Sequence, residues 1–280
     1  MKPATPFDGV AWVTGASSGI GRKTAERLIS LGWRVAVTAR SQEALEALAS
    51  DAQNAYGKII VMPGDVTDEA RMAAIVAELE RDHGGVGLAV LNAGIYMPIE
   101  GDQLDVETFR KTFDVNLGGV VNCLVPLSHV MASRGRGQIA IVSSVAGYGG
   151  LPTSAAYGAT KAGLTNMAES LKFDFDKMGI LLQVVHPGFV DTPATRSNPF
   201  SMPMLMDVDK AADALVSGLR RGGFEITFPK AFTRIMKVLN LLPYALYFPV
   251  LSRMTKWKER PLANAPGARD GKADKGHKRW

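Results

Sequence analysis

Tyr157 and Lys161 are the residues best suited to chemistry, and they lie four positions apart in a segment with helical periodicity. This spacing places both side chains on one face of a helix. A tyrosine hydroxyl titrates at about pH 10, and a nearby ammonium group favours its anionic form. We therefore expect Tyr157 to donate a proton to a carbonyl oxygen as hydride reaches the carbon, while Ser144 hydrogen-bonds the same oxygen.

A glycine-rich turn at residues 14–21, with the sequence TGASSGIG, follows a short apolar segment and opens a helical one. Glycines allow a tight turn and close approach of the backbone to a pyrophosphate, whose charge the helix N-terminus stabilises. An ordinary strand-to-helix turn is the alternative interpretation. We expect a dinucleotide to bind here, through Gly15, Ser17, Ser18, Gly19, Ile20 and Gly21.

The choice between the two nicotinamide cofactors depends on the end of the second predicted strand, where Ala39 and Arg40 lie. An acidic residue there would bind the adenosine ribose and repel a 2′-phosphate, whereas the fork of an arginine matches a phosphate. The sequence therefore favours NADP(H), with NAD(H) as the alternative if Arg40 only begins a solvated helix that Ser41 caps.

The order of the predicted elements shows how these motifs come together. Seven apolar segments predict strands at 10–14, 34–39, 58–62, 87–91, 138–143, 181–186 and 224–228. Amphipathic segments predict helices at 19–31, 41–55, 68–82, 105–132, 154–178 and 208–221. This alternation predicts an α/β, doubly wound Rossmann fold, with a seven-stranded parallel sheet and helices on both faces. In such sheets the ligand binds beyond the carboxyl ends of the strands, which is where the motifs lie.

Taken together, the motifs resemble those of the short-chain dehydrogenase/reductase family over about residues 7 to 228. Ser144 stands 13 positions before Tyr157, the family's spacing, which selects it over the adjoining Ser143. Leu91 is a departure, because many relatives have asparagine there; since it ends a buried strand, we expect no effect on catalysis. The other matching positions, in family order, are Asp65-Val66, Asn92-Ala93-Gly94, Asn116 and Pro187-Gly188 with Val190 and Thr192.

The resemblance also implies a role for each position. Asp65 and Val66 would contact the adenine, and Lys161 would bridge to the nicotinamide ribose. Asn116 would hold a water in a proton relay to Lys161. A relative that keeps the fold but serves only as a nucleotide-binding scaffold is the alternative. The cofactor groove would be lined by Asn92, Ala93 and Gly94, and the carboxamide oriented by Pro187, Gly188, Val190 and Thr192.

Composition divides the chain into a dinucleotide-binding and catalytic domain (1–228), an apolar helical extension (229–260) and a basic tail (261–280) that we expect to be disordered. Residues 194–207 contain three methionines, and the matching region of the family is a mobile lid. Met-rich surfaces adapt to apolar ligands, so we expect a bulky, lipid-like or steroid-like ketone as substrate. Oxidation of the corresponding alcohol, and a lid segment that only packs the domain, are the alternatives.

Charge is concentrated at the C-terminus. The net charge is +5, yet residues 253–280 carry nine basic and three acidic side chains, or +6, which leaves −1 for the other 252 residues. The high pI is therefore no sign of nucleic-acid binding. Within residues 230–258 a basic amphipathic helix precedes an apolar segment that is too short to span a membrane. This extension could lie on a membrane, cover the active-site mouth, or complete the interface of a homodimer or homotetramer.

The single cysteine, Cys123, excludes an intrachain disulfide and suits a reducing compartment. Its apolar neighbours indicate a buried helix face. The N-terminal residues contain no apolar stretch followed by a small-residue cleavage site. We therefore expect a cytoplasmic protein, and no metal site.

Overall fold

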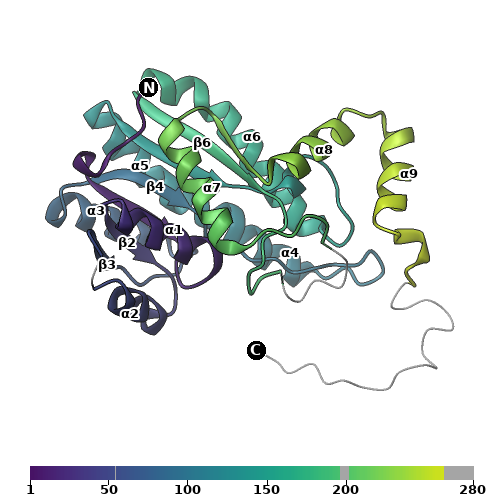
Figure 1. Ribbon diagram of the computed structural model, residues 1–280, viewed down its shortest axis with the longest axis horizontal. Helices are drawn as coiled ribbons and strands as arrows, with labels where there is room; N and C mark the ends of the chain where they lie inside the picture. The colour runs from purple at the N-terminus through teal and green to yellow at the C-terminus, as the bar shows by residue number, and fades with distance from the viewer. Residues whose placement is uncertain (54, 196–201, 262–280) are drawn as a thin grey trace.

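The seven predicted strands pair into one parallel sheet, whose order is β3-β2-β1-β4-β5-β6-β7 (Figure 1). The computed structural model describes residues 1–53, 55–195 and 202–261. The predicted doubly wound fold is confirmed, with strand ends shifted by one residue at most. The strands are β1 (Val10–Thr14), β2 (Arg34–Thr38), β3 (Lys58–Val61), β4 (Val86–Leu91), β5 (Gly137–Val142), β6 (Ile180–Pro187) and β7 (Glu225–Phe228).

Helices cover both faces of the sheet and bury it in two apolar layers. Leu28, Leu45 and Leu215 belong to one layer, and Ile75 and Leu127 to the other. Nearly every strand residue is buried, which explains why the strands are continuous apolar runs. The helices of the first layer are α1 (Gly19–Ser30), α2 (Gln42–Asp51) and α7 (Val208–Arg221), and those of the second are α3 (Glu69–Asp82), α5 (Gly119–Arg134) and α6 (Ala155–Lys177).

The helix predicted over 105–132 contains a break in its hydrogen-bond pattern that its periodicity did not predict. Helix α4 (Val106–Phe113) passes through a π-helical turn at Asp114–Gly118 before α5 begins. The whole segment, Val106–Arg134, is the one described helix long and apolar enough to cross a bilayer. Leu127 and the buried Cys123 nevertheless pack in the core beside the sheet, as in a helix of a globular domain.

Beyond β7 the chain forms α8 (Lys230–Asn240) and α9 (Tyr244–Met254), followed by a 3₁₀ turn, η4 (Trp257–Glu259). Their inner sides build a third apolar cluster, in which Phe232, Met236 and Leu251 pack with Val145 of the main domain. In Figure 1 these helices extend from one end of the sheet. Except for residue 261, the tail predicted to be disordered lies outside the described residues. The remaining 3₁₀ turns are η1 (Pro6–Asp8) and η3 (Val145–Gly147).

Candidate active site

A cavity of about 1200 Å³ opens at the carboxyl ends of the central strands. All but two of the site residues predicted from sequence line it. The exceptions are Gly21 and Asn116. Those that line it are Gly15, Ser17, Ser18, Gly19, Ile20, Arg40, Asp65, Val66, Asn92, Ala93, Gly94, Ser144, Tyr157, Lys161, Pro187, Gly188, Val190 and Thr192.

The glycine-rich turn fits closely against the end of β4. Gly15 has a φ of +68°, and a Cβ atom there would stand 2.8 Å from the Cα of Ala93. At Gly21 a Cβ would stand 2.3 Å from the Gly15 carbonyl oxygen, so this glycine is needed for packing although it lies outside the cavity. Asn92 donates from Nδ2 to the Thr14 carbonyl oxygen at 3.1 Å. These contacts fix the floor on which a dinucleotide would lie.

The N-terminus of α1 opens onto the same cavity. Its N-cap, Ser18, makes no side-chain capping hydrogen bond, whereas Ser41 of α2 and Asp68 of α3 do. The first turn of α1 also carries no acidic residue. Uncapped N–H groups and the positive end of the helix dipole suit an anionic ligand.

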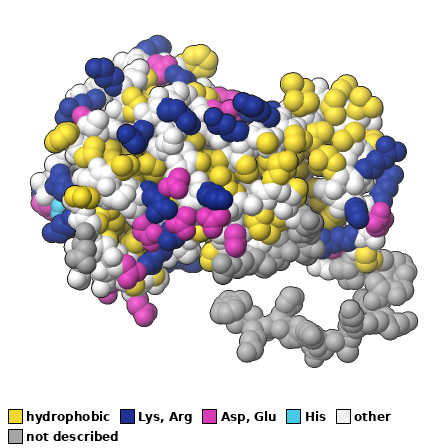
Figure 2. Space-filling model, in the orientation of Figure 1, with side chains coloured by type: hydrophobic (Ala, Val, Ile, Leu, Met, Phe, Trp, Pro, Cys, Tyr) yellow, Lys and Arg dark blue, Asp and Glu magenta, His cyan; other side chains and the backbone are white. Residues whose placement is uncertain are grey.

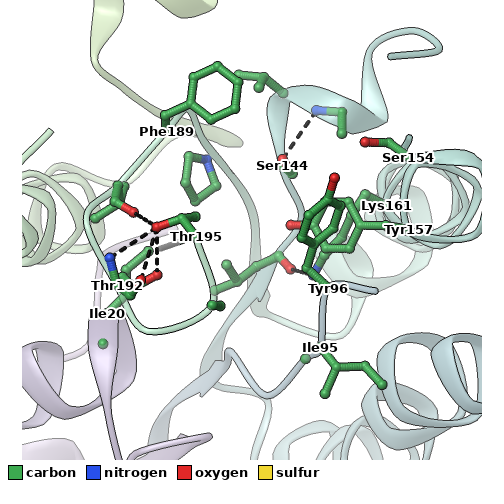
Figure 3. A pocket seen from close by; sticks show the side chains of 18 of the residues that line it. Ile20, Ile95, Tyr96, Ser144, Ser154, Tyr157, Lys161, Phe189, Thr192 and Thr195 are labelled. Atoms are coloured by element: carbon green, nitrogen blue, oxygen red, sulfur yellow. Dashed lines mark hydrogen bonds between the residues drawn. The ribbon is translucent and has the colours of Figure 1, made fainter. Parts of the chain in front are cut away.

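Tyr157, Lys161 and Ser144 lie on one side of the pocket in Figure 3, and Thr192 and Ile20 on the other. Ser144 follows β5 and caps η3, accepting a hydrogen bond from the backbone N–H of Ala146 at 3.1 Å. The first turns of α6 carry Tyr157 and Lys161. The Lys161 Nζ donates to the carbonyl oxygen of Val142 at 2.8 Å and lies 5.5 Å from the centre of the Tyr157 ring.

Burial controls the protonation of this pair. It raises the pKa of Tyr157 to about 12, which the hydrogen bond with Ser144 opposes and the neighbouring Tyr96 reinforces. Burial also lowers the pKa of Lys161 to about 8. Lys161, which was expected to lower the pKa of the tyrosine, is not among the groups that shift it, and its ammonium group donates instead to the Val142 carbonyl. At neutral pH Tyr157 keeps its proton.

Asn116 is fully buried in the π-helical turn. Its Oδ1 accepts from the Ile95 N–H at 2.8 Å, and its Nδ2 donates to the Ile95 carbonyl at 3.0 Å and to Thr160 Oγ1 at 3.2 Å. The side chain thus ties the loop after β4 to α6, close behind Lys161. Its role in a water relay stays a prediction.

At the adenosine end, Arg40 is exposed and makes no ion pair within the described part of the chain. Asp65 accepts hydrogen bonds from the N–H and the hydroxyl of Thr67, at 3.0 and 2.9 Å. Among the described residues no group of three His, Cys, Asp or Glu side chains could hold a metal ion.

Comparison with known proteins identifies this arrangement. A model of the short chain dehydrogenase family matches residues 9–200, more than half of the chain. The chain belongs to the short-chain dehydrogenase family. It is therefore an oxidoreductase of this family, as its motifs predict.

Three similar proteins illustrate the range of this short-chain dehydrogenase's relatives. An uncharacterized oxidoreductase of Myxococcus xanthus is 35% identical over 244 residues, which cover 87% of this chain and 96% of the relative. The cis-4-hydroxycyclohexanecarboxylate dehydrogenase of Sinomonas cyclohexanicum is 35% identical over 191 residues, covering 68% and 76%. The solved structure of a short-chain dehydrogenase from Sphingobium yanoikuyae in complex with NADPH is 25% identical, covers 93% of this chain and 98% of that one, and superposes with a TM-score of 0.72.

Sequence reasoning missed two side chains of this short-chain dehydrogenase's site. Tyr96 places its ring edge-on to Tyr157, with centroids 5.1 Å apart, and its hydroxyl lies 2.9 Å from Thr153 Oγ1. Thr195 donates to the Val190 carbonyl at 2.6 Å and accepts from the Thr192 N–H at 3.1 Å (Figure 3). The signal for Tyr96 was its place two residues after Asn92-Ala93-Gly94. No spacing rule pointed to Thr195.

Part of the wall of the dehydrogenase's cavity comes from the C-terminal extension. Phe232 and Met236 of α8, Leu251 of α9 and Trp257 of η4 all line it. Their apolar character was visible in the sequence, but their place in the same cavity as Tyr157 depends on the path of the chain after β7. Part of the Met-rich segment 194–207, including Phe200, lies outside the described residues.

Proposed function

We propose that this enzyme uses NADPH to reduce a bulky, apolar ketone to an alcohol. The observation that carries the proposal is the cavity, which Tyr157 lines together with the glycine-rich turn and apolar side chains of the extension; burial raises the pKa of Tyr157 to about 12. A residue that keeps its proton at neutral pH can give it to a carbonyl oxygen, which is what reduction requires.

The cavity fits a nicotinamide dinucleotide. The glycine-rich turn and the uncapped start of α1 would hold its pyrophosphate, and Asp65 and Val66 its adenine. Arg40 would pair with a 2′-phosphate, which favours NADP(H) over NAD(H). When bound, the cofactor supplies the hydride. The NADPH bound to the Sphingobium relative supports this choice.

Residues of the chain would then donate the proton to the substrate and replace it afterwards. Ser144 donates a hydrogen bond to the substrate oxygen and holds it beside Tyr157. Tyr157 gives its proton to that oxygen as negative charge develops on it. Lys161, whose pKa burial lowers to about 8, would contact the ribose and would restore the proton through a water held near Asn116. We expect the activity to decline as the pH rises through about 8, because Lys161 then loses its charge.

The apolar wall supports the choice of substrate. The wall of the same cavity includes two aromatic rings, a methionine and a leucine from the extension: Phe232, Trp257, Met236 and Leu251. Such surfaces bind apolar ligands mainly by burying apolar surface area, and less by specific hydrogen bonds. The Sinomonas relative, a dehydrogenase of a hydroxycyclohexane carboxylate, supports a cyclic substrate and makes alcohol oxidation the second candidate reaction.

A panel of carbonyl compounds of increasing size tests this function, with NADPH consumption as the readout. We expect bulky cyclic and lipid-like ketones to exceed acetone-sized ones in kcat/KM by at least about tenfold, since each extra buried methylene contributes about 0.8 kcal/mol. Bound NADPH without turnover of any member of the panel would instead support a nucleotide-binding scaffold.

The outer side of the extension supports a further proposal, that this cytoplasmic enzyme binds anionic membranes peripherally. An apolar patch there consists of Val238, Leu241, Tyr244, Leu246 and Phe248, and Leu241 is 83% exposed. Figure 2 shows hydrophobic side chains gathered at this end of the molecule, with Lys and Arg along their edge. Residues 230–260 contain seven basic side chains and one acidic one. A symmetric dimer would bring these like charges together, whereas anionic lipid would neutralise them.

Co-sedimentation with vesicles of phosphatidylcholine, with and without phosphatidylglycerol, tests the membrane contact. We expect binding only to the anionic vesicles, and a loss of at least about tenfold when Leu241, Tyr244 and Phe248 are all replaced by Asp. The matched control replaces three exposed aromatic residues elsewhere, Phe7, Tyr56 and Phe173, in the same way.

Equal binding by the two triple variants would contradict the membrane contact. A wild-type dimer that only the patch variant dissociates would also contradict it, and would assign the patch to subunit association.

A further inference from the structure

A polar cluster outside the cavity is centred on Glu225, the first residue of β7. Its Oε1 accepts a hydrogen bond from the Tyr148 hydroxyl at 2.7 Å and lies 2.9 Å from the Nδ1 of His186. Its Oε2 pairs with the ammonium group of Lys237, on α8. One carboxylate therefore joins the last strand, the segment after η3 and the C-terminal extension.

The cluster continues inward to the backbone of Lys161. His186, at the end of β6, is 1% exposed and packs against the Tyr148 ring with centroids 4.4 Å apart. Its Nε2 lies 3.0 Å from the hydroxyl oxygen of Thr165 on α6. That hydroxyl is 3.0 Å from the Lys161 carbonyl oxygen, which the Ser143 hydroxyl also reaches at 2.8 Å. An unbroken set of contacts thus runs from α8 to the helix turn that carries the reactive pair.

The ionisation of Glu225 determines which nitrogen of His186 carries a proton. Burial alone would raise the pKa of Glu225, but its contacts with His186, Lys237 and Tyr148 outweigh burial and lower the pKa to about 2. A carboxylate only accepts hydrogen bonds, so the Nδ1 that faces it must carry a proton. The two atoms are in close contact, although the ring N–H is not aligned with the carboxylate oxygen for a regular hydrogen bond.

The state of Nε2 then decides how the Lys161 carbonyl is held. If Nε2 also carries a proton, it donates to Thr165, whose own proton is free for the Lys161 carbonyl. If Nε2 is bare, Thr165 donates to it, and of the two hydroxyls only that of Ser143 still donates to the carbonyl, beside the regular backbone hydrogen bond of α6. The titratable groups around His186 are Glu225 from β7, Tyr148 from the segment after η3 and, through Glu225, Lys237 from α8.

We propose that Glu225 and His186 are positioning residues, which couple the placement of α8, a wall of the substrate cavity, to the backbone of Lys161. Neither residue lines the cavity, so each acts through another. Loss of Glu225 would leave the Nδ1 proton of His186 without a carboxylate beside it. It would also remove the ion pair that holds Lys237, and with it α8, against β7. The kinetic consequence rests on the proposed function, but the contact with the Lys161 backbone can be tested without any substrate.

The substrate-free test uses NMR of the full-length protein. The amide nitrogen of Ala162 shares a peptide bond with the Lys161 carbonyl, so its chemical shift responds to hydrogen bonding there. We expect Glu225→Gln to move both the Ala162 signal and the ring signals of His186. Lys230→Met, which removes a lysine from the exposed side of α8, is the matched control and should move neither. Unchanged Ala162 and His186 signals in Glu225→Gln would overturn the proposal.

The kinetic test separates positioning from a purely structural role. With a ketone that the wild type reduces, we expect Glu225→Gln to lower kcat by about tenfold and to shift its pH profile, because small displacements of a reactive pair are costly. Lys237→Met should mainly raise KM, since it frees only the cavity wall. A Glu225→Gln enzyme with a lower Tm but the kcat and pH profile of Lys230→Met would overturn the proposal. If no ketone is reduced by the wild type, the proposed function fails while the NMR result still stands.

Discussion

Replacing Tyr157 with phenylalanine is expected to lower kcat/KM for ketone reduction by roughly 10³-fold, within the range that a positioned proton donor contributes. The change removes one oxygen atom and leaves the ring that packs edge-on against Tyr96. Because burial raises the pKa of this hydroxyl to about 12, the wild type holds the proton throughout the neutral range. Steady-state rates of NADPH consumption, with a ketone selected from the panel, measure the effect.

The control for this experiment is Tyr96→Phe. Tyr96 also lines the cavity, but its hydroxyl pairs with Thr153 and would not reach the substrate oxygen. We expect a loss below about tenfold there, and unchanged NADPH affinity in both variants. If Tyr157→Phe kept more than about a tenth of the wild-type rate, another group would have to supply the proton.

The second large effect is expected at Arg40. Its replacement by alanine should reduce kcat/KM with NADPH by roughly 10²-fold and leave the value with NADH within about twofold, because hydrogen bonds to charged groups contribute about 1.5–3 kcal/mol each. Replacement by aspartate should reverse the preference, since a carboxylate repels the 2′-phosphate and accepts from a ribose hydroxyl. Parallel assays with both cofactors give the ratio.

Arg220→Ala is the matched control for this prediction. Arg220 is exposed near the end of α7, on an element that binds no part of the proposed dinucleotide. Its replacement removes one positive charge far from the proposed dinucleotide site, and it should change kcat/KM equally for NADPH and NADH. An Arg40→Ala enzyme with the wild-type ratio of NADPH to NADH efficiency would show that Arg40 only begins a solvated helix.

The fold could be predicted closely from the sequence, because the apolar segments and the residues of the turns between them indicated the same elements. Buried parallel strands are continuous apolar runs, and each was bounded by a turn that its glycines or helix caps made visible, such as Ser41 and Asp68. The π-helical turn at Asp114–Gly118 was not visible, because the apolar period of the helix continues through it. Within this turn, Asn116 makes hydrogen bonds to Ile95 and Thr160, which are distant in sequence.

The site was predictable where the chemistry lies within one element and its flanking turn. Tyr157 and Lys161 share one helix face, and their meeting needs no knowledge of the tertiary structure. The directions of their side chains did need it, since the Val142 carbonyl, and not the tyrosine, receives the lysine's hydrogen bond. The cavity wall from α8 and the contacts of Glu225 with His186 and Tyr148 were beyond sequence reasoning, because each depends on the tertiary structure and not on local spacing.

The buried Cys123 has a practical consequence for experiments on the extension. Burial raises the pKa of its thiol to about 12, so at neutral pH the chain offers maleimide reagents no reactive native thiolate. A cysteine introduced at an exposed position of α9 would then be labelled alone, without first removing the native one. Paired with a second introduced cysteine on α2, it would allow fluorescence or spin-label distances to follow the extension as cofactor and ketone are added.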